Sequence, residues 1–101
     1  MTLEWTQLAI ADLVEARAYV ELDSPHAAQD LARRILAAAE SLLDMPLIGR
    51  KGRSRATREK PVAGTPFILV YRLKAERVQI LRVYHGHRRW PPRPLARGST
   101  A

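Results

Sequence analysis

The sequence predicts an α+β domain in which a small antiparallel β-sheet carries an N-terminal α-helical hairpin on one face, in the order β-α-α-β-β-β. Apolar residues recur every three or four positions between residues 6 and 43, the period of amphipathic helices. Dense β-branched and aromatic runs follow between residues 57 and 84, as strands favour. At 101 residues the chain has room for one domain, which we place at residues 1–91, followed by a flexible tail at residues 92–101.

A change of period near residue 6 separates the first strand from the first helix. Leu3 and Trp5 alternate with polar neighbours, which predicts a short strand. From Thr6 to Glu21 the apolar spacing becomes helical. The residues on that apolar face are Ala9, Leu13, Ala16 and Val20.

A second helix is predicted from Pro25 to Leu43. Ser24 can cap its free N–H groups, Pro25 fits its first turn, and Pro46 lies just beyond its end. Its buried stripe is Ala28, Leu31, Ile35, Ala38 and Leu42. Because only a few residues separate the two helices, they must lie antiparallel and pack against each other and a third element.

That third element is predicted to be a sheet built from the second half of the chain. A basic connection at residues 49–55 leads into strands at residues 57–62, 67–73 and 78–84. Residues 64–66 form a turn before the second of these strands, and residues 74–77 form a hairpin connection before the third.

Period-two geometry assigns the side chains of the central strand to two faces. Phe67, Leu69, Tyr71 and Leu73 share the bulkier face and are expected to meet the helices, with Tyr71 in the core. Arg72 then points to the open face.

The pattern of the last strand fits two assignments of its side chains to the faces of the sheet. Placing Leu81 and Val83 in the core puts Arg82 on the open face, although Val78 and Ile80 share that face. With this assignment four cationic side chains project from one side of the sheet and form a concave cationic surface. They are Arg58, Lys60, Arg72 and Arg82. Glu59 points to the opposite face from Arg58 and is expected to form a salt bridge with a neighbour.

Composition narrows the chemistry and the compartment. The chain has no cysteine, which excludes disulfides and thiolate metal sites and suits a reducing compartment. No apolar run approaches the roughly 20 residues of a membrane span, and the first residues lack the features of a signal peptide. We therefore expect a cytoplasmic protein that does not bind membranes, and we expect no metal and no cofactor.

The net charge of +7 is divided unequally along the chain. Residues 1–46 hold three basic and eight acidic residues, whereas residues 47–101 hold fourteen basic and two acidic residues. Such a cationic half either attracts phosphate backbones or an acidic protein segment, or simply keeps a small protein dissolved.

Histidines, arginines and a tryptophan gather where the last strand ends, in the run V-Y-H-G-H-R-R-W-P-P-R at residues 83–93. His85 and His87 either act as general acid or base or are ordinary turn histidines, and they lack a nearby third metal ligand. Gly86 is expected to turn the chain. Trp90 either contacts a partner or anchors the chain end to the core.

Taken in order, these features resemble the RelE/ParE superfamily of toxins from type II toxin–antitoxin modules. The resemblance covers roughly residues 3–91 and rests on an ordered set of features more than on any single motif. The set comprises Trp5, the Ala9…Asp12-Leu13 helix opening, Pro25…Ala28, Pro46-x-x-Gly49-Arg50, Thr57-Arg58-Glu59, the strand from Phe67 to Tyr71, and the run I-L-R-V-Y-H-G-H-R-R-W-P at residues 80–91.

The resemblance implies a bacterial toxin held inactive by a cognate antitoxin, ParD-like or RelB-like, in a hetero-oligomer. RelE-like members cut mRNA on the ribosome, whereas ParE-like members poison DNA gyrase. A RelE-like activity would use His85, His87 and Arg82. The residues expected to bind phosphate or the partner are Arg50, Arg58, Lys60, Arg72, Arg88, Arg89 and Trp90.

Two departures favour the ParE-like activity. The chain lacks a tyrosine beyond Arg89, and Ile68 stands where the nucleases commonly place an arginine. Gyrase inhibition is therefore the first hypothesis, ribosome-dependent mRNA cleavage the second, and a non-toxic nucleic-acid-binding module the third.

Overall fold

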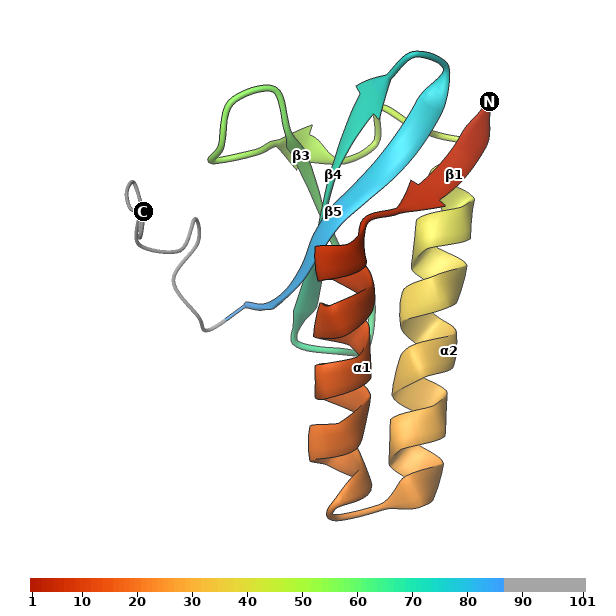
Figure 1. Cartoon of the computed structure of the whole chain (residues 1–101), viewed down its shortest axis with the longest axis vertical. Coiled ribbons are helices and arrows are strands. Elements are labelled where there is room, and N and C mark those ends of the chain that lie inside the picture. Colours follow the sequence, from red (N-terminus) through yellow and green to blue (C-terminus); the bar gives the residue numbers. More distant parts are fainter. Residues whose placement is uncertain (87–101) are drawn as a thin grey trace.

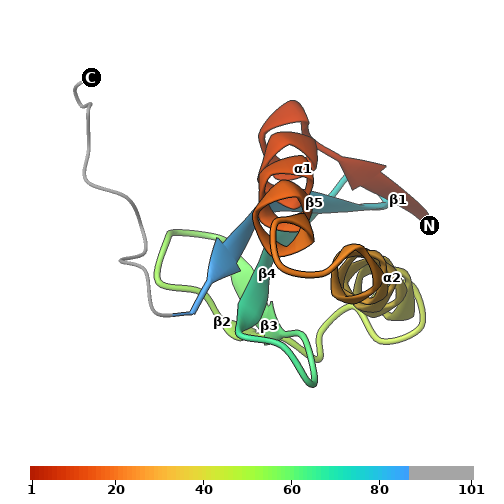
Figure 2. The same cartoon turned by 90° about the horizontal axis from the view of Figure 1, so that it is seen from below.

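Two antiparallel helices cover one face of a five-stranded sheet in the computed structural model, which describes residues 1–86 (Figure 1). The elements in chain order are β1 (Thr2–Trp5), α1 (Gln7–Glu21), α2 (Pro25–Ser41), β2 (Arg50–Lys51), β3 (Arg58–Pro61), β4 (Phe67–Lys74) and β5 (Arg77–His85). Both helices lie on the same side of the sheet (Figure 2). The predicted α+β class and helical hairpin are confirmed, while the predicted tail at residues 92–101 lies outside the described residues.

Each helix begins directly after the residue whose side chain caps it. The Thr6 hydroxyl accepts a hydrogen bond from the Ala9 N–H at 3.1 Å, and the Ser24 hydroxyl accepts one from the Ala27 N–H at 3.1 Å. Pro25 occupies the first turn of α2, as predicted. The helix ends at Ser41, slightly before the predicted end.

The core lies between the hairpin and the sheet, on the apolar stripes that the sequence predicts. Ala9 and Ala16 of α1 are buried, while Leu13 and Val20 pack against the core with partial exposure. The buried residues of α2 and the segment after it are Ala28, Leu31, Ile35, Ala39 and Leu42. They meet Leu69 and Tyr71 from the sheet, so Tyr71 is in the core as expected.

The sheet has the strand order β1-β5-β4-β3-β2. Its last four strands pair antiparallel, whereas β1 runs parallel to β5 with Trp5 opposite Ile80. The sheet is thus mixed and not purely antiparallel, because the N-terminal strand joins the free edge of β5 before the chain turns into α1. A short fifth strand, β2, forms within the segment that was expected to be only a basic connection.

A β-bulge in β5 determines which side chains of the last strand face the helices. The register shifts between Val70 and Tyr71 of β4, so that Tyr71 lies opposite Ile80 and Val70 lies opposite Arg82. Leu81 is the extra residue. Because one residue is skipped, Val78, Ile80 and Val83 all face the helices and are buried. The expected core position of Leu81 is wrong, since its side chain is only half-buried.

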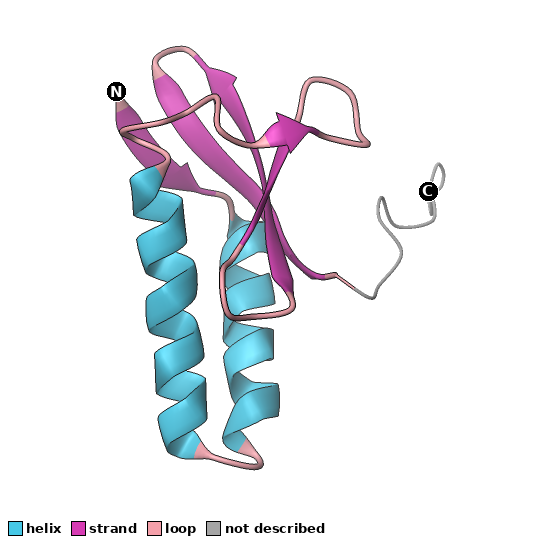
Figure 3. Ribbon diagram, turned by 180° about the vertical axis from the view of Figure 1, so that it is seen from behind, coloured by secondary structure: helices cyan, strands magenta, loops and turns pink. Residues whose placement is uncertain are grey.

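The β4–β5 turn uses two residues in the left-handed region of backbone space. Ala75 has φ of 51° and Glu76 has φ of 63°, while Lys74 and Arg77 form the last cross-strand pair. Two consecutive positive φ values match the right-handed twist of the flanking strands. The hairpin predicted at residues 74–77 is confirmed. Figure 3 shows this turn at the end of the sheet farthest from the helical hairpin tip.

Candidate functional site

His85 ends β5 beside an aromatic neighbour. Its ring lies edge-on to Phe67, with ring centroids 5.3 Å apart and an interplanar angle of 75°. The next residue, Gly86, turns the chain as expected, and its N–H donates a hydrogen bond to the Pro66 carbonyl at 2.6 Å. This bond ties the end of β5 to the β3–β4 turn and fixes where the imidazole lies.

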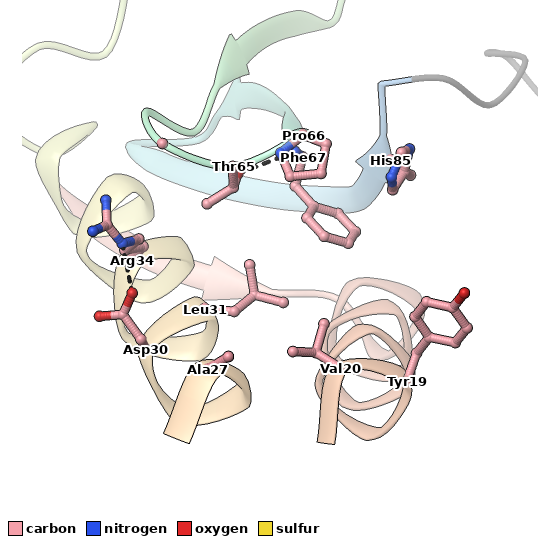
Figure 4. Close-up of a pocket in the computed structure, with 11 residues that line it drawn as sticks. Tyr19, Val20, Ala27, Asp30, Leu31, Arg34, Thr65, Pro66, Phe67 and His85 are labelled. Atoms are coloured by element: carbon pink, nitrogen blue, oxygen red, sulfur yellow. Dashed lines mark hydrogen bonds and ion pairs between the residues drawn. The ribbon is translucent and has the colours of Figure 1, made fainter. Parts of the chain in front are cut away.

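His85 and Phe67 line a cavity of about 310 Å³ between the helices and the β3–β4 turn (Figure 4). Val20 of α1 and Leu31 of α2 point toward Phe67 across it. An ion pair between Asp30 and Arg34, 2.9 Å long, lies on the α2 side. The cavity is therefore mainly apolar with a charged rim, which suits an apolar side chain of a partner.

A second cavity, of about 370 Å³, shares three residues with the first: Tyr19, Phe67 and His85. Asp12 and Glu15 of α1 also line it, so it is more acidic than the first cavity. Tyr19 is 75% exposed. We call Tyr19, Phe67 and His85 the aromatic ridge, because these three side chains line both cavities.

Arg82 is held by Asp12 of α1. Its Nε lies 2.7 Å from Oδ2 and its Nη2 lies 3.1 Å from Oδ1, and the Val83 N–H donates to Oδ2 at 2.9 Å. Because β1 ends opposite Ile80, the rest of β5 has an unpaired edge there, and Asp12 caps it. The hydrogen bond from Arg82 to Asp12 raises the pKa of the guanidinium above its usual value. Arg82 is thus part of an internal ion pair.

Glu59 is a buried carboxylate, only 1% exposed, between two arginines. Its Oε2 accepts a hydrogen bond from the Arg53 backbone N–H at 3.0 Å, and its Oε1 lies 3.2 Å from Nη2 of Arg50. Burial raises the pKa of Glu59, but the bonds from the Arg53 backbone and side chain and from Arg50 outweigh it, so the pKa lies below its usual value. The expected salt bridge of Glu59 is confirmed.

Arg58 and Lys60 bind backbone carbonyls near the helix-facing side of the sheet. Nη1 of Arg58 donates to the Gly49 carbonyl at 2.8 Å and to the Leu47 carbonyl at 3.2 Å. Nζ of Lys60 lies 3.4 Å from the carbonyl of Pro61. Arg58 therefore holds the segment that enters β2.

Arg72 belongs to a polar network across three strands. Its Nε donates to Oε1 of Gln79 at 2.6 Å, and Nε2 of Gln79 donates to Oε1 of Glu4 at 2.9 Å. Arg77 completes the network with a 3.2 Å ion pair to Glu4. Three neighbouring strands, β4, β5 and β1, are thus joined on the open face.

The expectation that four cations share one face is wrong. Arg58 lies opposite Tyr71 and Lys60 lies opposite Leu69, and both partners are buried beneath the helices. Arg72 alternates with these core residues and lies on the other face. The register of β3 against β4 places Glu59 on the open face, where Arg58 and Lys60 were expected. Alternation within one strand cannot show this register.

Four residues named from the sequence, His87, Arg88, Arg89 and Trp90, lie outside the described residues. Within residues 1–86, no three His, Cys, Asp or Glu side chains are grouped to hold a metal ion. In the same range, no helix is long and apolar enough to cross a membrane.

The sequence profile described as the ParE toxin of the type II toxin–antitoxin system parDE matches residues 3–90. The chain belongs to the ParE toxin family. Y4kP of Sinorhizobium fredii is 42% identical to this ParE-family chain over 89 residues, which cover 88% of the chain and 92% of Y4kP. Toxin RelE2 of Caulobacter vibrioides is 38% identical over 84 residues, covering 83% of the chain and 93% of RelE2.

A solved structure shares the ParE-family fold. A chain of the chromosomal ParDE TA system from P. aeruginosa superimposes with a TM-score of 0.76 at 30% identity, covering 84% of this chain and 95% of that one. These matches confirm the resemblance drawn from the sequence. The ParE-family chain is a type II toxin, and its partner is a cognate antitoxin.

Sequence reasoning missed three residues that build this ParE-family site: Asp12, Tyr19 and Arg53. Asp12 sits on a helix 70 residues away from Arg82, so no local pattern connects them. Tyr19 continues the helical spacing of Asp12 and Glu15, and a large aromatic side chain on that polar face is a usable signal of a contact surface. Arg53 contacts Glu59 through its backbone N–H as well as its side chain, and no side-chain pattern reports the backbone bond.

Proposed function

We propose that this toxin arrests bacterial growth by inhibiting DNA gyrase, as a ParE-like member. The match to the ParE toxin family over residues 3–90 carries the proposal. The commitment of Arg82 to Asp12, with 25% and 14% of the two side chains exposed, supports it. A ribonuclease needs cations free to bind the phosphate in the transition state, and Arg82 already has a carboxylate partner.

The separation of the candidate acid from the candidate cations favours the same activity. Arg58 and Arg72 line one cavity, whereas His85 lines two others that include neither of them. A phosphoryl-transfer site needs its acid, base and cations to converge on one reacting group. Inhibition of gyrase by binding has no such requirement.

Ribosome-dependent mRNA cleavage is the alternative, favoured by the 38% identity to toxin RelE2. In that activity His85, at the accessible end of β5, would act as general acid or base, together with His87. Arg82 would stabilise charge on the phosphate after leaving Asp12.

Two reconstituted assays distinguish the activities. Purified toxin is added to gyrase with closed circular plasmid DNA, and separately to a purified translation system with labelled mRNA. We expect cleaved DNA–gyrase complexes to accumulate and the mRNA to stay intact. Translation-dependent mRNA cuts without any effect on gyrase would contradict the proposal.

The variant His85→Gln/His87→Gln sharpens the comparison. A ribonuclease that uses a histidine as acid or base should lose about 10²–10⁴-fold in cleavage rate in this variant. Addition of the antitoxin to the native toxin is the control in both assays, because it should abolish whichever activity is real.

We further propose that the antitoxin, ParD-like or RelB-like, docks on the hairpin and on the aromatic ridge. α1 exposes Ile10 and Val14 on one flank, and Leu8 and Tyr19 on the other. An antitoxin segment that crosses the hairpin would cover Ile10 and Val14 with one part and place an apolar side chain in the 310 Å³ cavity beside Tyr19 with another.

A further inference from the structure

The segment between β2 and β3 lies at the end of the sheet away from the α1–α2 turn (Figure 1). Residues of this segment line a cleft. The cleft has a volume of about 610 Å³ and includes Leu47, Leu73 and several small polar residues in its wall. Its cationic lining residues are Lys51, Arg53, Arg55, Arg58 and Arg72, and no lining residue is acidic. Such a concentration of one charge sign attracts anions.

The loop that forms the cleft is fixed by its own hydrogen bonds. The Gly52 N–H donates to the Thr57 carbonyl at 2.8 Å, and the Thr57 hydroxyl donates to the Ser54 carbonyl at 2.7 Å. A Cβ at Gly52 would collide with Thr57, so this close approach requires glycine. Glu59, a buried residue of β3, accepts a hydrogen bond from the Arg53 backbone N–H and so holds the loop against that strand. The cationic groups are therefore held on a preorganised loop.

Most of the positive charge is not neutralised within the described part of the chain. Within residues 1–86, Lys51 and Arg55 form no hydrogen bond or ion pair through their side chains. Arg58 binds backbone carbonyls and Arg72 binds the Gln79 amide oxygen, both of which are uncharged. Only Arg53 has a carboxylate partner there. Four like charges around one cleft call for a polyanion or counterions.

We propose that this cleft binds the phosphate backbone of a nucleic acid. Phosphates recur at regular spacing and offer paired oxygens that guanidinium groups bind well. An acidic peptide would also need apolar anchor pockets, and the cleft offers only two large apolar side chains among its lining residues, Leu47 and Leu73, against five cationic ones. The inference does not depend on gyrase as the target, because it concerns binding by the toxin alone.

Fluorescence anisotropy of the purified full chain tests the proposal. The probes are labelled duplex DNA, single-stranded DNA and RNA of equal length, with a glutamate-rich peptide as the competing polyanion. The variant Lys51→Gln/Arg55→Gln removes the two lining cations whose side chains have no partner among residues 1–86, and Arg17→Gln/Arg33→Gln removes the same net charge from exposed positions on the helices. Circular dichroism confirms that each variant is folded.

We expect the native chain to bind at least one nucleic acid with a strong salt dependence. In the Lys51→Gln/Arg55→Gln variant, the slope of log K against log salt should fall by about 1.4–1.8, the value for two lost phosphate contacts. The helix variant should retain nearly the native slope. The relative affinities for the three nucleic acids identify the source of the phosphates.

Three results would overturn the inference. An equal fall in slope for both double variants would mean that diffuse surface charge accounts for binding. Tighter binding of the glutamate-rich peptide than of any nucleic acid would assign the cleft to a protein segment. Absence of binding at 50 mM salt would leave the cleft without the proposed ligand, whatever the gyrase assays show.

Discussion

Glu59 shows how one buried carboxylate organises a basic surface. It neutralises part of the charge of Arg50 and Arg53 and fixes the backbone of the loop through the Arg53 N–H. Without it, the loop that leads into β3 would carry only like charges. The residue therefore contributes to stability through the folded state and to the site through geometry.

The lowered pKa of Glu59 makes this contribution pH-dependent. Because the folded-state pKa lies below the usual value of 4.5, the stabilisation is complete above that value and is lost as pH falls through the folded pKa. Urea unfolding should show Glu59→Gln destabilised by about 1–3 kcal/mol at pH 7, with a smaller difference from the native chain at pH 3. An equal difference at both values would contradict this role.

The Asp12–Arg82 pair permits a direct measurement of coupling. Two charge-assisted bonds link the side chains, and both are mostly buried. A double-mutant cycle of Asp12→Ala and Arg82→Ala should give a coupling free energy of about 1–3 kcal/mol in chemical denaturation. The pair Asp30–Arg33, exposed on α2, is the matched control and should give a much smaller coupling free energy.

At the scale of the element, the two helix caps differ in the contacts that their hydroxyl groups make. Ser24 caps α2 and makes no further side-chain bond among the described residues, whereas the Thr6 hydroxyl also lies 3.0 Å from the carbonyls of Ile80 and Leu81. Thr6→Ala should therefore lower the free energy of unfolding by about 2 kcal/mol and Ser24→Ala by about 1 kcal/mol. Thr6→Ser keeps the hydroxyl and should recover most of the loss, measured by urea denaturation.

The β4–β5 turn has residues that disfavour the backbone conformation they adopt. Ala75 and Glu76 both have positive φ, a conformation that costs residues other than Gly and Asn about 1 kcal/mol each. Ala75→Asn/Glu76→Gly should raise the free energy of unfolding by about 1 kcal/mol and raise the melting temperature. Ala75→Val in the same turn should lower both, because a β-branched side chain tolerates that region poorly.

Local patterns predicted the elements well because each depends on neighbours in sequence. The helical stripes, the Ser24 cap and the hairpin at residues 74–77 were all predictable. The bulge at Leu81, the parallel partner of β1 and the register of β3 were not, since each is decided by a strand elsewhere in the chain. The prediction of four cations on one face was wrong for this reason, because a register shift of one residue moves the side chains of a strand to the opposite face of the sheet.

At the scale of the whole molecule, α1 is apolar on two sides. One side packs into the core, and the other exposes Ile10 and Val14 to solvent. Val14 is 61% exposed, so Val14→Asp should leave the melting temperature nearly unchanged. We expect it to weaken antitoxin binding at least tenfold in calorimetry, if α1 is the docking surface.

Lys74→Gln, which makes the same change in net charge beside the β4–β5 turn and not on α1, is the control for the antitoxin experiment. It should leave the affinity within about threefold of the native value. Equal losses for the two variants would assign the effect to charge alone and would contradict docking on the apolar side of α1.

Pairing of β1 with β5 brings the first five residues against residues 77–80. During synthesis on the ribosome, both helices emerge well before the strand that completes the layer beneath them. The nascent hairpin must therefore expose its inner stripe until β5 appears, which delays formation of the native toxin and favours chaperone binding.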